Sequence, residues 1–291
     1  MTGAVADRPR DLLVSGHVNI DRFLSVRSFP EADRTVPVLE HRAEVGGTAA
    51  NIARVASKLG VATGLVARVG DGFPDEYVAE FRRAGIDVRG IQRVSGRPTP
   101  TCYTIEDLEG AQRTLIDQGV MARVPGARLP LRLLREYSWL HLTTADPEFQ
   151  LRLLKAARAR GLLVAADPAQ EIHYRWDRRS FRTLLQGSEL FFGNRSEVAR
   201  ALEFVGGDRP EVLLEFVPLV IRTEGRSGAT AFSRTGTVHV RAARPTRVRT
   251  FVGAGDSFRG GFYAAWFAGQ SLVACLTAGT RSSARWIEGK R

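Results

Sequence analysis

The chain has 291 residues, of which 44% are hydrophobic and 25% charged, enough to bury the core of one large α/β domain. No run of eighteen apolar residues occurs, and the polar first ten residues lack the apolar centre of a signal peptide. We therefore expect a cytoplasmic protein with no membrane partner. Cys102 and Cys275 lie far apart and without a cysteine or histidine cluster, so we expect ordinary thiols.

The formal net charge of +11 raises the possibility of a protein that binds nucleic acid, because basic surfaces gather phosphate backbones. Such a protein would concentrate its cations in a stripe. Here the positive residues are almost all arginines, and they are spread along the chain between apolar positions. We therefore expect no specific nucleic-acid partner, although a scattered basic surface favours anionic substrates such as ATP.

Short apolar runs alternate with amphipathic helical patterns along most of the chain. This rhythm predicts an α/β fold with a mostly parallel central sheet covered by helices. The predicted strands are 12–14, 64–69, 139–142, 162–166, 189–192 and 219–222, and the predicted helices are 49–59, 74–84, 147–160, 181–185 and 196–204.

Two segments, about 23–45 and 99–115, break this rhythm and alternate apolar with polar residues. The second contains the hairpin signal Glu109-Gly110. We expect the two segments to pair into a small separate sheet that covers a ligand at the carboxyl ends of the main strands, as a lid. No internal repeat appears, so residues 8–291 are expected to form a single α/β domain with these two lid segments.

The strongest motif is residues 250–261, Thr-Phe-Val-Gly-Ala-Gly-Asp-Ser-Phe-Arg-Gly-Gly, followed by an apolar helical run over 262–268. Glycines before a helix let successive amides converge on one point, where the helix dipole adds positive potential, and this suits a phosphate. Asp256 at such a helix start could simply be a cap. Phosphoryl transfer, however, needs charge stabilisation and a nearby carboxylate, so we predict Asp256 as the base and Gly253, Ala254 and Gly255 as the anion hole.

This segment resembles the second signature of the ribokinase-like carbohydrate kinases of the phosphofructokinase-B type. This chain also has a segment that resembles the family's first signature, Gly46-Gly47-Thr48-Ala49-Ala50-Asn51, which leads into a small-residue helix. A double glycine alone is weak, because any tight turn can use it, but two signatures in the family's order are specific. The resemblance implies a ribokinase-like three-layer α/β/α fold with a small β-sheet lid.

Further matches extend the resemblance over nearly the whole chain. They include Gly16-His17-Val18-Asn19-Ile20-Asp21, Asn194-Arg195-Ser196-Glu197, and the strand and loop from Arg222 to Gly228. Within the family, residues 141–149 and 167–170 look most like archaeal-type nucleoside kinases. The resemblance therefore favours a nucleoside as the substrate.

For the substrate, the resemblance implies that Asp21 and Asn51 hold hydroxyl groups and that Gly46 and Gly47 let the backbone approach the sugar closely. The alternative for Asp21 is a residue that only terminates a strand. The alternative for Asn51 is a residue that only caps a helix.

For the nucleotide, the resemblance implies contacts from Asn194, Thr223, Gly225 and Gly228. It also implies that Glu197 organises Mg²⁺, largely through water, as suits an ion that dehydrates reluctantly. Asn194 and Glu197 stand three apart at a predicted helix start, so a capping box is the alternative for this pair.

Two departures from the family pattern bear on activity. The second signature usually begins with an aspartate that helps to bind a monovalent cation, whereas this chain has Thr250, Phe251 and Val252 there, which puts potassium dependence in doubt. Relatives also usually continue past the segment Trp286-Ile287-Glu288-Gly289 with a loop beside the adenine and a last helix. We therefore expect the adenine pocket to be incomplete or built differently.

Together these patterns predict an Mg²⁺-dependent and ATP-dependent phosphotransferase that phosphorylates a primary hydroxyl group of a nucleoside. Phe23, Phe29 or Tyr103 could line a pocket for a flat base. The alternatives are a ribose-like or fructose-like sugar, with or without a phosphate, and a non-catalytic relative that only binds a ligand. An unpaired strand within 35–45 would be an exposed edge, so we expect a homodimer.

Overall fold

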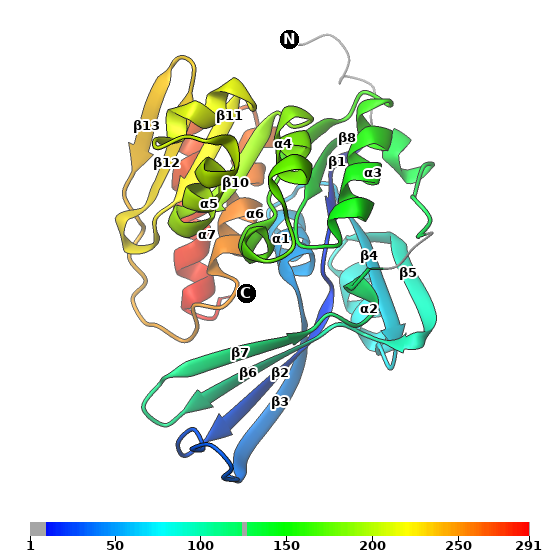
Figure 1. Ribbon diagram of the computed structural model, residues 1–291, viewed down its shortest axis with the longest axis vertical. Coiled ribbons are helices and arrows are strands. Elements are labelled where there is room, and N and C mark those ends of the chain that lie inside the picture. The colour runs from blue at the N-terminus through cyan, green and yellow to red at the C-terminus, as the bar shows by residue number, and fades with distance from the viewer. Residues whose placement is uncertain (1–9, 124–126, 291) are drawn as a thin grey trace.

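The computed structural model describes residues 10–123 and 127–290, so residues 8, 9, 124–126 and 291 of the expected domain lie outside the described part. A sheet of nine strands forms its centre (Figure 1), in the order β13-β12-β11-β10-β9-β8-β1-β4-β5. The strands are β1 (Arg10–Ser15), β4 (Thr63–Asp71), β5 (Asp87–Pro98), β8 (Tyr137–Leu142), β9 (Leu163–Ala166), β10 (Leu190–Asn194), β11 (Leu219–Thr223), β12 (Ala229–Ser233) and β13 (Gly236–Val240).

Neighbouring strands are parallel from β5 through β4, β1, β8, β9 and β10 to β11. Strands β12 and β13 add an antiparallel hairpin at one edge. The mostly parallel sheet predicted from the sequence is therefore confirmed. The prediction missed β5 and β13, which carry many polar or exposed residues, and β12, which is buried but mixes Thr and Ser with its apolar residues, so none shows a continuous apolar run.

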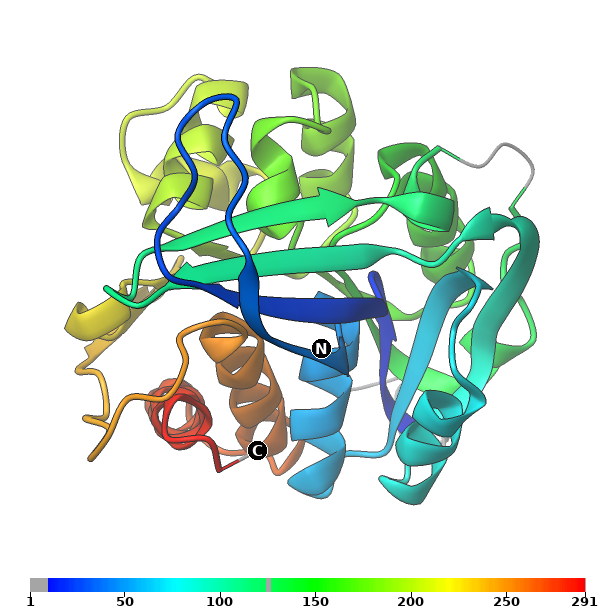
Figure 2. The ribbon, with the colours of Figure 1, turned by 90° about the horizontal axis from the view of Figure 1, so that it is seen from below.

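Helices cover both faces of the sheet (Figure 2). One layer holds α1 (Thr48–Lys58), α2 (Asp75–Arg83), α6 (Ala254–Phe267) and α7 (Leu272–Ile287), and the other holds α3 (Pro147–Arg158), α4 (Arg178–Gln186) and α5 (Arg195–Val205). Short 3₁₀ turns are η1 (Gly119–Met121), η2 (Leu133–Glu136), η3 (Ala169–His173), η4 (Pro210–Glu215) and η5 (Gly225–Ser227).

Alternate residues of β1 pack into two separate hydrophobic cores, one on each face of the sheet. Leu12 and Val14 of β1 pack in the core under α1 and α6, whereas Leu13 between them packs in the core under α3 and α4. Successive side chains of a strand point to opposite faces, so a strand buried on both faces must be apolar throughout. This explains why the buried strands were visible in the sequence.

Helix α6 lies in close contact with α1 on one side and α7 on the other. A Cβ atom at Gly260 would lie 2.6 Å from Cβ of Val55, and one at Gly261 would lie 2.5 Å from Cβ of Ser282. Real Cβ atoms do not approach so closely, so these two glycines set the spacing of the three helices.

A second sheet of four strands, in the order β3-β2-β6-β7, projects from one end of the main body (Figure 1). Its strands are β2 (Asn19–Val26), β3 (Val38–Gly46), β6 (Thr101–Asp107) and β7 (Gln112–Asp117). The predicted small sheet is confirmed, and the predicted hairpin at Glu109-Gly110 joins β6 to β7 in antiparallel pairing. The central pair β2 and β6 is parallel, so the sheet is built from two hairpin-like halves distant in sequence.

Helices differ from the prediction mainly near the C-terminus. Helix α6 begins at Ala254, ahead of the apolar run that starts at residue 262, and the structure adds α7, which the sequence prediction lacked. Helix α4 is longer than predicted because Asp177 and Ser180 form a capping box at its start. Among residues 10–123 and 127–290, no helix has the length and apolar character needed to cross a membrane.

We predict that Phe262→Ala lowers the free energy of unfolding by about 3–5 kcal/mol, because the ring is fully buried and removing it leaves a cavity. It packs edge-on against Phe192 and stacks on Trp266. The control is Phe251→Ala, since Phe251 is 58% exposed and should change stability by less than about 0.5 kcal/mol. Urea denaturation followed by circular dichroism measures both, and equal losses would contradict the core assignment.

Candidate active site

The two sequence signatures meet at one hydrogen bond. Nδ2 of Asn51, on α1, donates to Oδ2 of Asp256, on α6, over 2.9 Å. The residues are 205 positions apart in sequence. The amide and the carboxylate that the sequence predicted for substrate binding and catalysis therefore lie side by side, and Asn51 does not act as the helix cap of α1, which is Gly47.

The first turn of α6 leaves its amides open. Gly253 precedes the helix in the left-handed region, at φ 81°, and no side chain among the described residues caps it. The amide of Ala254 donates to Phe251 O, and that of Ser257 donates to Gly253 O. The amides of Gly255 and Asp256 lie between them in the turn, where a helix offers no acceptor, so they are available to bind a negatively charged group.

Helix α7 holds this turn in place. Nε1 of Trp286 donates to Val252 O over 2.7 Å, and Oγ of Ser283 donates to Ala254 O over 2.7 Å. A Cβ atom at Gly253 would lie 2.8 Å from the indole of Trp286, so only glycine fits there. The last helix, which was not predicted from the sequence, therefore supports the turn before α6 directly.

Thr250 occupies the position at which the family pattern has an aspartate. Its Oγ1 accepts a hydrogen bond from the amide of Val252 over 3.2 Å. The hydroxyl thus stabilises the chain just before the turn. A hydroxyl carries no charge, so this position lacks the carboxylate that would hold a monovalent cation.

The Asp256 carboxyl has a raised pKa of about 6, chiefly because packing around it disfavours the charged form. The hydrogen bond from Asn51 and the positive charge of Arg259 act in the opposite direction and lower the pKa, whereas the negative charge of Asp167 raises it. Asp256 therefore titrates just below neutral pH, in the range that suits a general base.

Asp21, Gly46 and Gly47 lie together where the lid joins the main body. Asp21 on β2 pairs with Glu44 on β3, and a Cβ atom at Gly46 would lie 1.9 Å from Oδ2 of Asp21. Gly47 has φ 97°, and a Cβ atom there would lie 2.4 Å from His17 O. Gly46 is therefore needed to make room for the Asp21 carboxylate, and Gly47 is needed to let the backbone approach His17.

Asn194 and Glu197 form the capping box that sequence analysis gave as their alternative role. Oδ1 of Asn194 accepts from the Glu197 amide over 2.9 Å, and Oε2 of Glu197 accepts from the Asn194 amide over 2.7 Å. Glu197 is only 6% exposed, and burial raises the pKa of its carboxyl. Asn194 also lies opposite Thr223 in the pairing of β10 with β11.

Gly225 and Gly228 shape the loop that follows β11. Both have positive φ, 57° and 109°. A Cβ atom at Gly228 would lie 2.0 Å from Val240 O on β13, so this glycine is needed for backbone packing. Nothing lies within 4 Å of the corresponding position at Gly225, so the surface over that glycine is open.

A pocket lies between the lid strand β7 and the carboxyl ends of β1, β8 and β9. In this pocket, Gln118 lies 2.7 Å from His17 Nε2 and donates to Glu171 Oε1 over 3.2 Å. Burial lowers the pKa of His17 to about 4 and raises that of Glu171 to about 7. The pocket is lined by His17, Asn19, Thr48, Ile116, Gln118, Thr144, Gln170, Glu171 and Tyr174.

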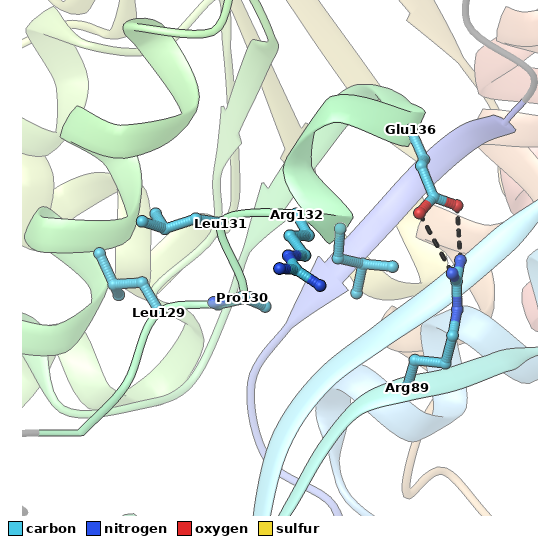
Figure 3. Close-up of a pocket in the computed structure, with 7 residues that line it drawn as sticks. Arg89, Leu129, Pro130, Leu131, Arg132 and Glu136 are labelled. Atoms are coloured by element: carbon cyan, nitrogen blue, oxygen red, sulfur yellow. Dashed lines mark hydrogen bonds and ion pairs between the residues drawn. The ribbon is translucent and has the colours of Figure 1, made fainter.

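A larger cavity of about 380 Å³ lies away from these residues. Figure 3 shows Arg89, near the start of β5, paired through two hydrogen bonds with Glu136, which immediately precedes β8. The segment 129–133 forms the rest of the lining. The amino ends of parallel strands lie at the opposite edge of the sheet from their carboxyl ends, so this cavity is separate from Asp256.

The charged pair beside Asp256 was not predicted from the sequence. Arg259 is 5% exposed and Asp167 is fully buried, and the guanidinium bonds the carboxylate through two nitrogens. A partial signal existed, because Arg259 lies within the second signature and Asp167 within a segment that carries the family resemblance. Their pairing spans 92 positions and is visible only in the fold.

No cluster of three or more carboxylate, histidine or cysteine side chains is arranged to hold a metal within the described ranges. Cys102 and Cys275 are free thiols, as expected. A metal at this site would have to take most of its ligands from water and from a bound phosphate chain, which suits Mg²⁺.

The fold and the two meeting signatures define a ribokinase-type architecture. The solved nucleoside kinase of Methanocaldococcus jannaschii, an archaeal member of the ribokinase family, superposes with a TM-score of 0.86 at 25% identity. The alignment covers 97% of this chain and 92% of that one.

The chain belongs to the pfkB family of carbohydrate kinases, whose model matches residues 9–290, and it is an ATP-dependent kinase of that class. It is 31% identical over 272 residues to a nucleoside kinase of Methanothermobacter thermautotrophicus, covering 91% of this chain and 85% of the relative. It is also 31% identical over 263 residues to an ATP-dependent ribose-1-phosphate kinase of Halopiger xanaduensis, covering 88% and 84%. The family resemblance, including its archaeal nucleoside kinase branch, is confirmed.

We predict that Gly47→Ala destabilises the protein by at least about 2 kcal/mol more than Gly60→Ala. The two glycines flank α1 and both have positive φ, 97° and 91°, so an alanine is strained at either position. Only at Gly47 would the new methyl group also meet a backbone carbonyl, since nothing lies within 4 Å of Gly60. Thermal and urea unfolding compare the variants. An equal loss of stability would show that close approach at Gly47 is unimportant.

Proposed function

We propose that the enzyme transfers the γ-phosphoryl group of ATP to a primary hydroxyl group of a nucleoside, with Asp256 as the general base. The observation that carries this proposal is the Asp256 carboxylate, hydrogen-bonded to Asn51 at the open amino end of α6. A hydroxyl held beside Asp256 would give up its proton to the carboxylate as the phosphoryl group arrives.

The first turn of α6 would stabilise the charge on the migrating group. The amides around Gly253, Ala254 and Gly255 and the positive end of the helix dipole act where negative charge builds up. Because Trp286 and Ser283 fix the backbone carbonyls of this turn, the amides need no rearrangement during the reaction. Preorganised donors of this kind are the main resource of enzymes that transfer phosphoryl groups.

The nucleotide would lie across the ends of β10 and β11. Asn194 and Thr223 are neighbours there, and the open surface over Gly225 leaves room for the nucleotide beside the loop that Gly228 shapes. Glu197 would hold Mg²⁺ through water while its second role, in the capping box, keeps its orientation. When bound, Mg²⁺ would neutralise phosphate charge.

The substrate would occupy the region from Asn51 to the pocket under the lid. Asp21, Gly46 and Gly47 would hold the sugar, with Asp21 and Asn51 binding its hydroxyls. The pocket continues past Thr48 and Asn19 toward Gln118 and Glu171, so it offers polar partners beyond the sugar position. A ribose would leave these partners unused, whereas a nucleoside base would bond with them, and this supports the nucleoside over the sugar.

The first prediction under this proposal concerns turnover. With Mg²⁺ and ATP, one class of acceptor from a panel of nucleosides, free sugars and sugar phosphates should be phosphorylated, and Asp256→Asn should lower kcat by about 10²–10⁴-fold. Coupled ADP release measures the rate, with and without potassium. Turnover only on sugars or sugar phosphates would assign the alternative substrate class, and ligand binding without turnover would assign a non-catalytic role.

The matched control is Asp177→Asn. Asp177 also stands at a helix start, where its side chain accepts from the Ser180 amide over 2.7 Å, and asparagine caps a helix about as well. If Asp256 were only a helix-terminal carboxylate, the two substitutions would have the same small effect on kcat.

The second prediction concerns pH. Burial raises the Asp256 pKa to about 6, so the ionised base is abundant above that pH and is lost as the pH falls through it. We expect kcat/KM for the acceptor to fall about tenfold per pH unit below about pH 6. Circular dichroism at each pH shows whether the protein stays folded. A rate that stays flat down to about pH 4.5 would exclude Asp256 as the base with this pKa.

A further inference from the structure

A chain of buried polar groups lies beneath the first turn of α6. The Tyr263 hydroxyl lies 2.8 Å from Nδ1 of His141, and Nε2 of His141 lies 3.1 Å from Oδ2 of Asp167. Asp167 in turn pairs with Arg259 through two hydrogen bonds. Tyr263, His141 and Asp167 are fully buried, so this chain is shielded from solvent.

In this series of buried polar groups, each hydrogen-bond donor meets an acceptor. Burial lowers the pKa of His141, so its ring is neutral and carries one N–H. The Asp167 carboxylate only accepts, which places that N–H on Nε2 and leaves Nδ1 to accept from the Tyr263 hydroxyl. The hydrogen bonds therefore all run toward Asp167 and fix the orientation of its carboxylate.

The guanidinium of Arg259 connects these hydrogen-bonded groups to the turn at the start of α6. Nε and Nη2 donate to Asp167, and Nη1 donates to the backbone carbonyl of Gly255 over 3.0 Å. A Cβ atom at position 255 would lie 3.1 Å from Nη1, so the absence of a side chain permits this approach. The Arg259 guanidinium thus connects Asp167, at the end of β9, to Gly255, the residue before Asp256.

Charges of both signs surround the Asp256 carboxylate. Asn51 donates a hydrogen bond to it from α1. The charges of Arg259 on the same helix, Asp167 at the end of β9 and Glu197 on α5 interact with it electrostatically. The positive charge of Arg259 lowers the Asp256 pKa, and the negative charge of Asp167 raises it. The two members of one ion pair therefore act on the same carboxylate with opposite sign.

We propose that Arg259 and Asp167 form a positioning pair for phosphoryl transfer, which fixes the Gly255 carbonyl and balances the electric field at Asp256. Neither residue touches the substrate in this proposal. It rests on the proposed function, because it assigns the pair a role toward the base and the anion-binding turn.

The competing explanation is an ordinary core ion pair that only ties β9 to α6. Breaking such a pair from either side leaves one buried charge without its partner, so both substitutions would destabilise the protein. Any effect on the catalytic carboxylate would then follow from loosened packing and would have the same sign in both variants. A balanced field predicts effects of opposite sign.

The test compares Arg259→Gln with Asp167→Asn by the dependence of kcat/KM on pH, between about pH 5 and 9. The acidic limb is the fall in kcat/KM at low pH. We expect its apparent pKa to rise by about one pH unit in Arg259→Gln and to fall by a similar amount in Asp167→Asn. We also expect kcat to fall about 10–100-fold in Arg259→Gln, because the turn loses the bond at Gly255. Shifts of the same sign, or no shift in either variant, would overturn the proposal.

Two further variants separate charge from geometry. Arg259→Lys keeps the positive charge but loses the planar fork, so its acidic limb should stay near that of the wild type while kcat falls. Arg158→Gln breaks the surface pair of Arg158 with Glu189, 2.7 Å apart and distant from the site, and should leave both the limb and kcat unchanged. A limb that moves as far in Arg259→Lys as in Arg259→Gln would exclude a role for the charge.

A measurement that needs no turnover keeps this proposal separable from the proposed function. NMR titration of protein labelled with ¹³C at the aspartate carboxyl groups, without nucleotide or metal, reports the Asp256 signal, which is assigned by its loss in Asp256→Asn. Opposite shifts of its midpoint in the two variants would support the balanced field even if no acceptor were phosphorylated. Midpoints that move in the same direction would sink the proposal even in an active kinase.

Discussion

The close packing of α6 between α1 and α7 is the constraint on which the site depends. Gly260 and Gly261 let α6 approach both neighbours, and one turn earlier on α6 this spacing brings Asp256 within hydrogen-bond distance of Asn51. On the other side it places Trp286 against Gly253. The catalytic carboxylate proposed here and the turn before it are thus positioned by backbone contact between helices, which deforms far less than a loop would.

Much of this arrangement could be predicted from the sequence. Strands buried on both faces carry continuous apolar runs, and the glycine-rich turns that approach backbone or side chains appear as Gly46-Gly47 and as Gly253 and Gly255. The resemblance also assigned Asn51 and Asp256 to one site, although only the fold shows the hydrogen bond between them. In these cases a local pattern carries the information, whether as periodicity or as a required glycine.

What the sequence could not supply are interactions between residues that are unremarkable on their own. Arg259 lies within the second signature but belongs to an arginine-rich chain, and only the fold shows that it is buried against Asp167. Helix α7 was missed although it has an apolar face, and its support for the turn before α6 depends on where its last residues lie in the fold. The roles of Asn194 and Glu197 illustrate a third limit, because a helix cap and a nucleotide site use the same residue types at the same spacing.

The parallel pairing of β2 with β6 also bears on how the protein folds. Ile20 pairs with Thr101, and the chain between them forms α1, β4, α2 and β5 of the main body. Closing so long a segment costs entropy that a few strand contacts do not recover, whereas the β6–β7 hairpin closes locally. We therefore expect the lid sheet to be completed late, after β1, β4 and β5 have already brought its two central strands to the same edge.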